Sequence, residues 1–123
     1  MLFRSDRSCN LMISHGSFEA LLMGDPSASV EPSLARQIPS ELDWLLVSHH
    51  GAGTSSSPAW LNHVKPKYAV ISAGARNAFG HPHPDVIQRL KRRDALVFST
   101  SKQGGLVFEI SKKGQVSWRS VLE

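Results

Sequence analysis

Residues 43 to 51 read Asp-Trp-Leu-Leu-Val-Ser-His-His-Gly, a nearly continuous apolar run that ends on two histidines and a glycine. A run of this kind is typical of a strand buried on both faces, as found in parallel sheets covered by helices. Residues 68 to 72 and 96 to 100 repeat the pattern, and helical patterns lie between the runs. This alternation of strands with helices predicts an α/β fold, with a mixed sheet flanked by helices.

The predicted helices carry start signals, and two hairpins frame them. Ser57 as N-cap and Pro58 at the first helical position open one helix, and Pro84 with Asp85 opens another. Residues 29 to 37 form a shorter helical pattern. Apolar-rich runs at 9 to 14 and 17 to 23 predict a hairpin that delivers Asp25 to a sheet end. Residues 105 to 111 and 115 to 121 predict a second hairpin.

Composition limits the chain to one globular domain. It has 123 residues, of which 41% are apolar and 20% charged. Its longest apolar runs are four residues, too short for a membrane span or the core of a secretion signal. Cys9 is the only cysteine, which excludes an internal disulfide and a cysteine-cluster zinc site. The net charge of +4 favours acidic partners only weakly, and ordinary solubility is the preferred explanation, because the basic residues are dispersed.

Polar side chains follow three of the predicted strands: Asp25, the pair His49 and His50, and the loop of His81 and His83. Ligands of α/β sheets gather at the carboxyl ends of strands. Carboxylate and imidazole groups suit a zinc or manganese ion when thiolates are absent. Each piece alone has a structural explanation, as a turn former, a helix cap or a proline-fixed loop. Neighbours on an extended strand point to opposite faces, so both histidines of the pair would bind one ion only if the backbone bends at Gly51.

The order of these pieces is more specific than any one of them. Leu-Leu-Met-Gly-Asp precedes Leu-Leu-Val-Ser-His-His-Gly, and Tyr-Ala-Val-Ile-Ser-Ala-Gly and Gly-His-Pro-His-Pro follow. From Ser8 to the last hairpin, the chain resembles the C-terminal half of the metallo-β-lactamase-like domain of ComEC-type competence proteins. The resemblance implies that residues 1 to 123 form one partial domain of an αββα sandwich, without its N-terminal half.

The resemblance also implies roles for individual residues. Asp25 would take the place of an aspartate that bridges two metal ions, and His49 or His50 that of the last histidine ligand, with His49 favoured at the strand end. His81 and His83 would border the site and act on the leaving oxygen or bind phosphate. The expected substrate contacts are Thr54, Ser55 and Arg76.

Two departures from the family pattern limit these expectations. The sequence contains no His-x-His-x-Asp-His or similar motif, and Ser5 stands where the family has an asparagine. The chain offers about two ligands, fewer than the three protein ligands of a catalytic zinc ion. We therefore expect an incomplete metal site and a chain that is inactive by itself: a fragment, the product of a split gene, or part of a larger polypeptide.

The function implied is metal-dependent hydrolysis of phosphodiesters during DNA uptake in natural competence. Its partners would be DNA, single-stranded by preference, and the rest of a parent channel protein in the bacterial inner membrane, with this domain outside the cytoplasm. Two alternatives stay open. One is a small-molecule hydrolase of the same superfamily, and the other is a non-catalytic basic half-domain that binds nucleic acid or a partner protein.

Overall fold

The computed structural model describes residues 2–5, 8–24, 31–38, 41–53, 55–73 and 82–121, and for residues 2–5, 8, 9, 49 and 50 the backbone alone. Its centre is a six-stranded mixed sheet in which the strands follow one another in chain order. The first three strands pair antiparallel, and the third to the sixth run parallel. The strands are β1 (Leu2–Ser5), β2 (Ser8–His15), β3 (Phe18–Leu22), β4 (Trp44–Leu46), β5 (Tyr68–Ile71) and β6 (Leu96–Ser99).

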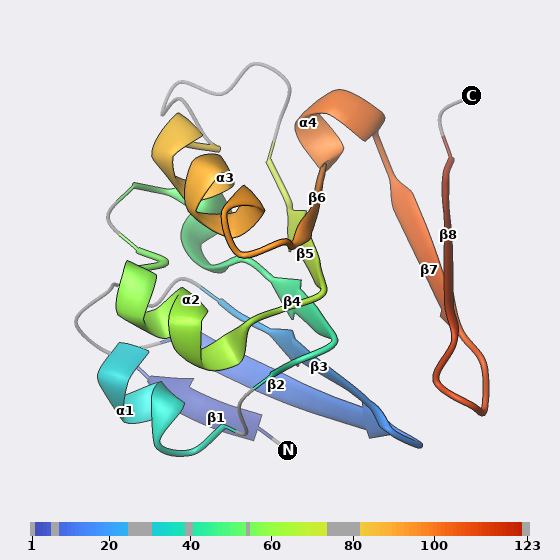
Figure 1. The fold of residues 1–123 in the computed structure, drawn as a ribbon, viewed down its shortest axis with the longest axis horizontal. Helices are drawn as coiled ribbons and strands as arrows, with labels where there is room; N and C mark the ends of the chain where they lie inside the picture. The colour runs from blue at the N-terminus through green and yellow to red at the C-terminus, as the bar shows by residue number, and fades with distance from the viewer. Residues whose placement is uncertain are drawn as a thin grey trace.

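Three helices cover one face of this sheet (Figure 1). They are α1 (Glu31–Ala35), α2 (Pro58–Val64) and α3 (Pro84–Lys91). Their apolar sides meet the inward residues of β3, β4 and β5 in one core cluster, where Leu45, Leu61 and Leu90 are fully buried. The oxygen of Ser57 accepts from Trp60 N at 3.2 Å, and Pro58 follows, so the helix start predicted from these residues is confirmed.

A separate hairpin covers part of the other face (Figure 1). It consists of β7 (Leu106–Ile110) and β8 (Val116–Ser120), paired antiparallel. The ring of Phe108 packs edge-on against Trp44, Tyr68 and Phe98, with centroids 5.6, 6.2 and 5.3 Å apart. Trp118 adds a fourth ring contact, to Phe98 at 4.6 Å. Aromatic packing therefore attaches the hairpin to the sheet.

The predicted α/β fold is confirmed, and the two edge strands of the sheet differ from expectation. Residues 2 to 5 form the edge strand β1, which the sequence pattern did not indicate. The strand predicted over 96 to 100 ends at Ser99, because Ser99 caps a short helix, α4 (Thr100–Gln103), and its oxygen accepts from Ser101 N. Within the described ranges, no helix is long and apolar enough to cross a membrane.

Candidate active site

The carboxyl ends of β3 and β4 lie side by side and in register. Leu22 is paired with Leu46 across the two parallel strands. In the sequence, Asp25 comes three positions after Leu22, and His49 comes three positions after Leu46. The two predicted ligands therefore follow adjacent strand ends at the same offset. Asp25, Thr54, Arg76 and His81 themselves lie outside the described residues.

The histidine pair lies on a turn instead of an extended strand. Strand β4 ends at Leu46, and residues Ser48–Gly51 form a single 3-10 turn, η2. Gly51 has a φ of 78°, a left-handed conformation that glycine adopts without steric cost. The expectation that the strand runs directly into the pair was therefore wrong. Adjacent residues on such a turn need not point to opposite faces, so either histidine is a candidate ligand.

The turn that carries the histidine pair contacts the segment that precedes α3. The backbone N–H of His83 donates to the carbonyl oxygen of Gly51 at 2.9 Å. A Cβ atom at Gly51 would lie 2.9 Å from Cβ of Pro82, so only glycine fits against this proline. At Gly53, a Cβ atom would lie 3.1 Å from Cδ2 of the His83 ring. Two loops, joined by a hydrogen bond between residues 32 positions apart in sequence, thus form one surface beside the strand ends.

The imidazole of His83 caps α3. Its Nδ1 accepts from the backbone N–H of Asp85 at 3.1 Å, and Oδ2 of Asp85 lies 3.8 Å from the same nitrogen. A neutral imidazole that accepts at Nδ1 carries its proton on Nε2. The side chain is 47% exposed, so Nε2–H is a donor available to an oxygen of a ligand. This tautomer suits contact with phosphate or metal-bound water, because direct coordination through Nε2 requires a lone pair there.

A buried carboxylate that sequence reasoning missed fixes the loop after the histidine pair. Glu31 is 1% exposed, and its two oxygens accept from Ser56 N at 2.6 Å and Ser57 N at 3.0 Å. Ser56 has a φ of 57°, and its carbonyl oxygen accepts from Arg89 Nη1 at 3.2 Å. The loop between η2 and α2 is thus tied to both α1 and α3. Glutamate is rarely buried, and nothing local in the sequence identifies Glu31 as an exception.

Two buried polar side chains also lie at this end of the sheet. Asn10 is fully buried, and its Oδ1 accepts from Gly24 N at 2.9 Å, directly before Asp25 in sequence. Ser48 is fully buried and directly precedes the histidine pair. Asn10 Nδ2 and Ser48 Oγ have no hydrogen-bond partner among the described residues. Such buried polar atoms call for a ligand, an ion or water as partner.

Of the predicted substrate contacts, Ser55 alone lies among the described residues, and two histidines outside the predicted site, His63 and His15, are described with it. Ser55 is 1% exposed and donates to the carbonyl oxygen of Ala52 at 3.3 Å, so its burial favours a role in holding the loop; its contact with substrate stays a prediction. His63 Nε2 lies 2.9 Å from Ile38 O and joins α2 to the chain after α1. His15 is exposed at the opposite end of the sheet.

The described residues contain no group of three or more histidine, cysteine or acidic side chains that would hold a metal ion. Asp25, His49 and His50 are outside that test, because their side chains are not among those described. The chemistry of this set, one carboxylate and two imidazoles after adjacent strands, suits a zinc or manganese ion. The unpartnered atoms of Asn10 and Ser48 beside it are consistent with a polar ligand at this end of the sheet.

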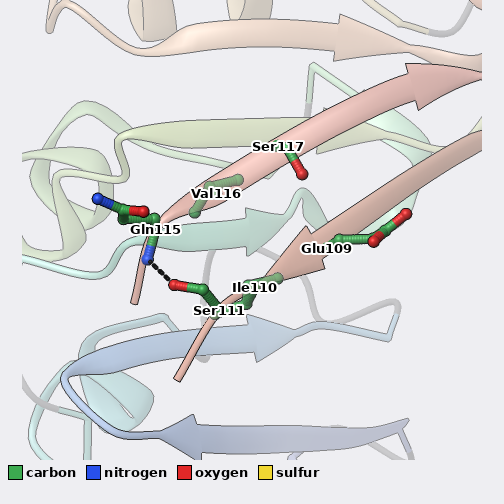
Figure 2. A pocket seen from close by; sticks show the side chains of 6 residues that line it. All are labelled: Glu109, Ile110, Ser111, Gln115, Val116 and Ser117. Atoms are coloured by element: carbon green, nitrogen blue, oxygen red, sulfur yellow. Dashed lines mark hydrogen bonds between the residues drawn. The ribbon is translucent and has the colours of Figure 1, made fainter. Parts of the chain in front are cut away.

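The β7–β8 hairpin carries a pocket that lies away from the candidate site. It has a volume of about 330 Å³ and is lined by Glu109, Ile110, Ser111, Gln115, Val116 and Ser117 (Figure 2). Ser111 Oγ accepts from Gln115 N at 3.0 Å across it. The hairpin turn beyond the pocket lies against the turn between β2 and β3, where a Cβ atom at Gly16 would be 3.0 Å from Lys112 O. The pocket therefore lies near the end of the sheet opposite the histidine pair.

Comparison with known proteins aligns most of the chain with one segment of much longer proteins. It is 37% identical over 100 residues to Recombination protein 2 of Haemophilus influenzae. This alignment covers 81% of this chain and 13% of that protein. It is 36% identical over 110 residues to Competence protein ComA of Neisseria gonorrhoeae, covering 88% of this chain and 16% of ComA. It is 30% identical over 111 residues to ComE operon protein 3 of Bacillus subtilis, and this alignment covers 89% of this chain and 14% of that protein.

No protein-family model matches the sequence. The chain spans 13 to 16% of the length of these three relatives. Each alignment covers more than four fifths of this chain. The chain is therefore homologous to one segment of proteins named for competence and recombination.

Proposed function

We propose that this chain is the C-terminal half of a metallo-β-lactamase-like domain that hydrolyses phosphodiester bonds of DNA during natural competence. The observation that carries the proposal is the geometry at the strand ends. The predicted ligands follow the adjacent strands β3 and β4, and the histidine-pair turn hydrogen-bonds to the His83 loop. The names of the relatives support the link to competence.

Asp25 and His49 or His50 would hold the metal, with the remaining ligands supplied by polypeptide outside these 123 residues. A bound zinc or manganese ion would supply an activated water and positive charge beside the phosphate. The chain's own contribution is positional. Gly51 allows the turn that carries the pair, and Glu31 holds the loop that follows it.

His83 would donate a hydrogen bond from Nε2–H to the phosphate or to the leaving oxygen. Its Nδ1 is engaged with Asp85 N, so the ring orientation is fixed by the start of α3. A hydrogen-bond donor held in this way stabilises charge that develops on oxygen in the transition state. His81 would share this task.

An apolar strip on the sheet would receive the second half of the domain. Met12 packs against the core on the helix side, so its neighbours Leu11 and Ile13 point to the opposite face. They are 40% and 43% exposed. The β7–β8 hairpin makes its ring contacts at Trp44, Tyr68 and Phe98, on β4 to β6. Leu11 and Ile13 on β2 therefore offer a surface for a second sheet.

The test compares this chain with a longer polypeptide in which the matching N-terminal half precedes it. Both are assayed on single- and double-stranded DNA with manganese or zinc. We expect cleavage by the longer polypeptide only, and its loss in Asp25→Ala. Glu109→Ala, at an exposed position on β7, is the control and should retain activity. Cleavage by the short chain at the same rate would show that the ligand assignment is wrong.

A further inference from the structure

A pocket at the outer edge of the sheet lies between α3, β6 and α4. Both helices contact β6, and they flank it in the ribbon (Figure 1). The pocket has a volume of about 270 Å³ and is lined by Ile87, Lys91, Val97, Ser99, Lys102 and Gln103. We propose that this pocket binds one nucleotide of a single-stranded DNA segment, with Lys91 and Lys102 on its phosphates; the proposal rests on the proposed function.

The charged groups at the pocket are all positive. Lys91 comes from α3 and Lys102 from α4, both are exposed, and no carboxylate lines the pocket. Neither lysine forms an ion pair with any described residue. The nearby Arg89 and Arg93 are engaged instead, with Ser56 O at 3.2 Å and Asn62 Oδ1 at 2.7 Å. Lys91 and Lys102 are therefore the cations that line this pocket within the described part of the chain, and an anion is the ligand that they favour.

Polar residues that line the pocket beside the two lysines add a hydrogen-bond donor. Gln103 Oε1 accepts from Ser99 N at 2.8 Å, which leaves the amide NH₂ group of Gln103 as a donor. The Ser99 and Ser101 hydroxyls bond each other at 2.6 Å. These contacts hold α4 onto the end of β6 and set the position of Lys102.

The apolar walls select the kind of anion. Ile87 and Val97 are partly buried against the core and also line the pocket. Inorganic phosphate gains nothing from such walls, whereas a nucleotide brings a base beside its phosphate. Duplex DNA keeps its bases stacked inside, so only a single strand can place a base there without unpairing.

The location of the pocket connects it to the candidate site. Ser99 ends β6 at the same edge of the parallel sheet as the histidine pair that follows β4. Thr100 Oγ1 accepts from Ala73 N at 2.9 Å, which joins α4 to the carboxyl end of β5. A single strand that lies across this edge would contact both the histidine surface and the lysine pocket.

The test measures binding of a fluorescein-labelled oligothymidylate by anisotropy, in EDTA so that no metal-dependent step contributes. We compare the full chain with the double variant Lys91→Gln/Lys102→Gln. The matched control is Lys112→Gln/Lys113→Gln, which removes the same charge from the β7–β8 turn. We expect the affinity for the oligomer to fall about tenfold in the pocket variant and about twofold or less in the control. The slope of log Kd against log salt concentration should become smaller by about 1.4 in the pocket variant only, because two phosphate contacts are lost.

An abasic oligomer of the same length keeps the phosphates and should bind several-fold more weakly than oligothymidylate. Equal losses in the two double variants would overturn the proposal, because they would show attraction by net charge alone. Displacement of a bound dye-labelled nucleotide by thymidine monophosphate, without binding of the oligomer, would overturn it in favour of a free-nucleotide site. Because these measurements need no metal and no cleavage, they stay informative if the longer polypeptide proves not to be a nuclease.

Discussion

The backbone N–H of His83 donates a hydrogen bond of 2.9 Å to the carbonyl oxygen of Gly51. This bond joins the histidine-pair turn after β4 to the segment that opens α3. It forms because Gly51 takes a left-handed φ of 78° and lets Pro82 approach its Cα. The candidate site therefore depends on a position where a side chain has no room.

Gly51→Ala is expected to disrupt this contact. A left-handed conformation costs a non-glycine residue about 1–3 kcal/mol. The new Cβ would also meet Cβ of Pro82 at 2.9 Å and Cγ2 of Ile71 at 3.2 Å, which adds to that cost. Urea unfolding measures the change.

Gly53→Ala is the matched control, because Gly53 is not left-handed and its added Cβ, at 3.1 Å from Cδ2 of His83, requires a shift of only a few tenths of an ångström. Its free energy of unfolding should change less than that of Gly51→Ala. Equal losses in the two variants would show that the packing of Gly51 against Pro82 is not the special feature of this turn.

Leu90→Ala tests the helix side of the core. Leu90 is fully buried in the cluster between α3 and the sheet, so its truncation should lower the free energy of unfolding by about 2–5 kcal/mol. Leu96→Ala makes the same chemical change at a position that is 57% exposed and should cost about 0.5 kcal/mol or less. A loss below 1 kcal/mol at Leu90 would contradict the packing described for α3.

The sequence predicted most of the elements because their signals are local. The apolar runs around Leu45 and Val70 identify central strands, and the two adjacent residues Ser57 and Pro58 identify the start of a helix. Strand β1 was missed because residues 2 to 5 are too short and mixed to read as a strand before their pairing with β2 is known.

The sequence predicts which residues belong to the candidate site, but not all of the contacts that hold them in place. Parallel strands bring their carboxyl ends together, so the approach of the histidine-pair turn to the His83 loop follows from the fold class. Glu31 could not be found, because the amide groups that it accepts from lie 25 and 26 positions away. Binding of one ion by both histidines was expected only if the backbone bends at Gly51. Whether the bend forms depends on packing against Pro82, which no local pattern encodes.

Glu31→Ala should destabilise the loop before α2. Removal of the carboxylate leaves the amides of Ser56 and Ser57 without their acceptors, and Ser56 is buried. Hydrogen bonds to charged groups contribute about 1.5–3 kcal/mol, which sets the expected loss in free energy of unfolding. Amide exchange at Ser56 and Ser57 should accelerate as well.

Glu109→Ala removes an exposed glutamate from β7 and serves as the control, with an expected change of about 0.5 kcal/mol or less. Unchanged protection of the Ser56 and Ser57 amides in Glu31→Ala would argue against the role assigned to this carboxylate.

The two functions assigned to His83 can be separated by two substitutions. Asparagine is a good N-cap and would replace the Nδ1 acceptor for Asp85 N, but it lacks a donor at the position of Nε2. The free energy of unfolding of His83→Asn should therefore lie within about 0.5 kcal/mol of that of the parent chain, whereas His83→Ala should lose about 1 kcal/mol.

In the longer polypeptide, both variants should reduce turnover of DNA while metal affinity, measured by competition with a chelating dye, stays unchanged. His81→Ala is expected to behave in the same way. If His83→Asn retained full turnover, the ring would be a helix cap alone, and an equal collapse of metal binding in either His81→Ala or His83→Ala would make that residue a ligand.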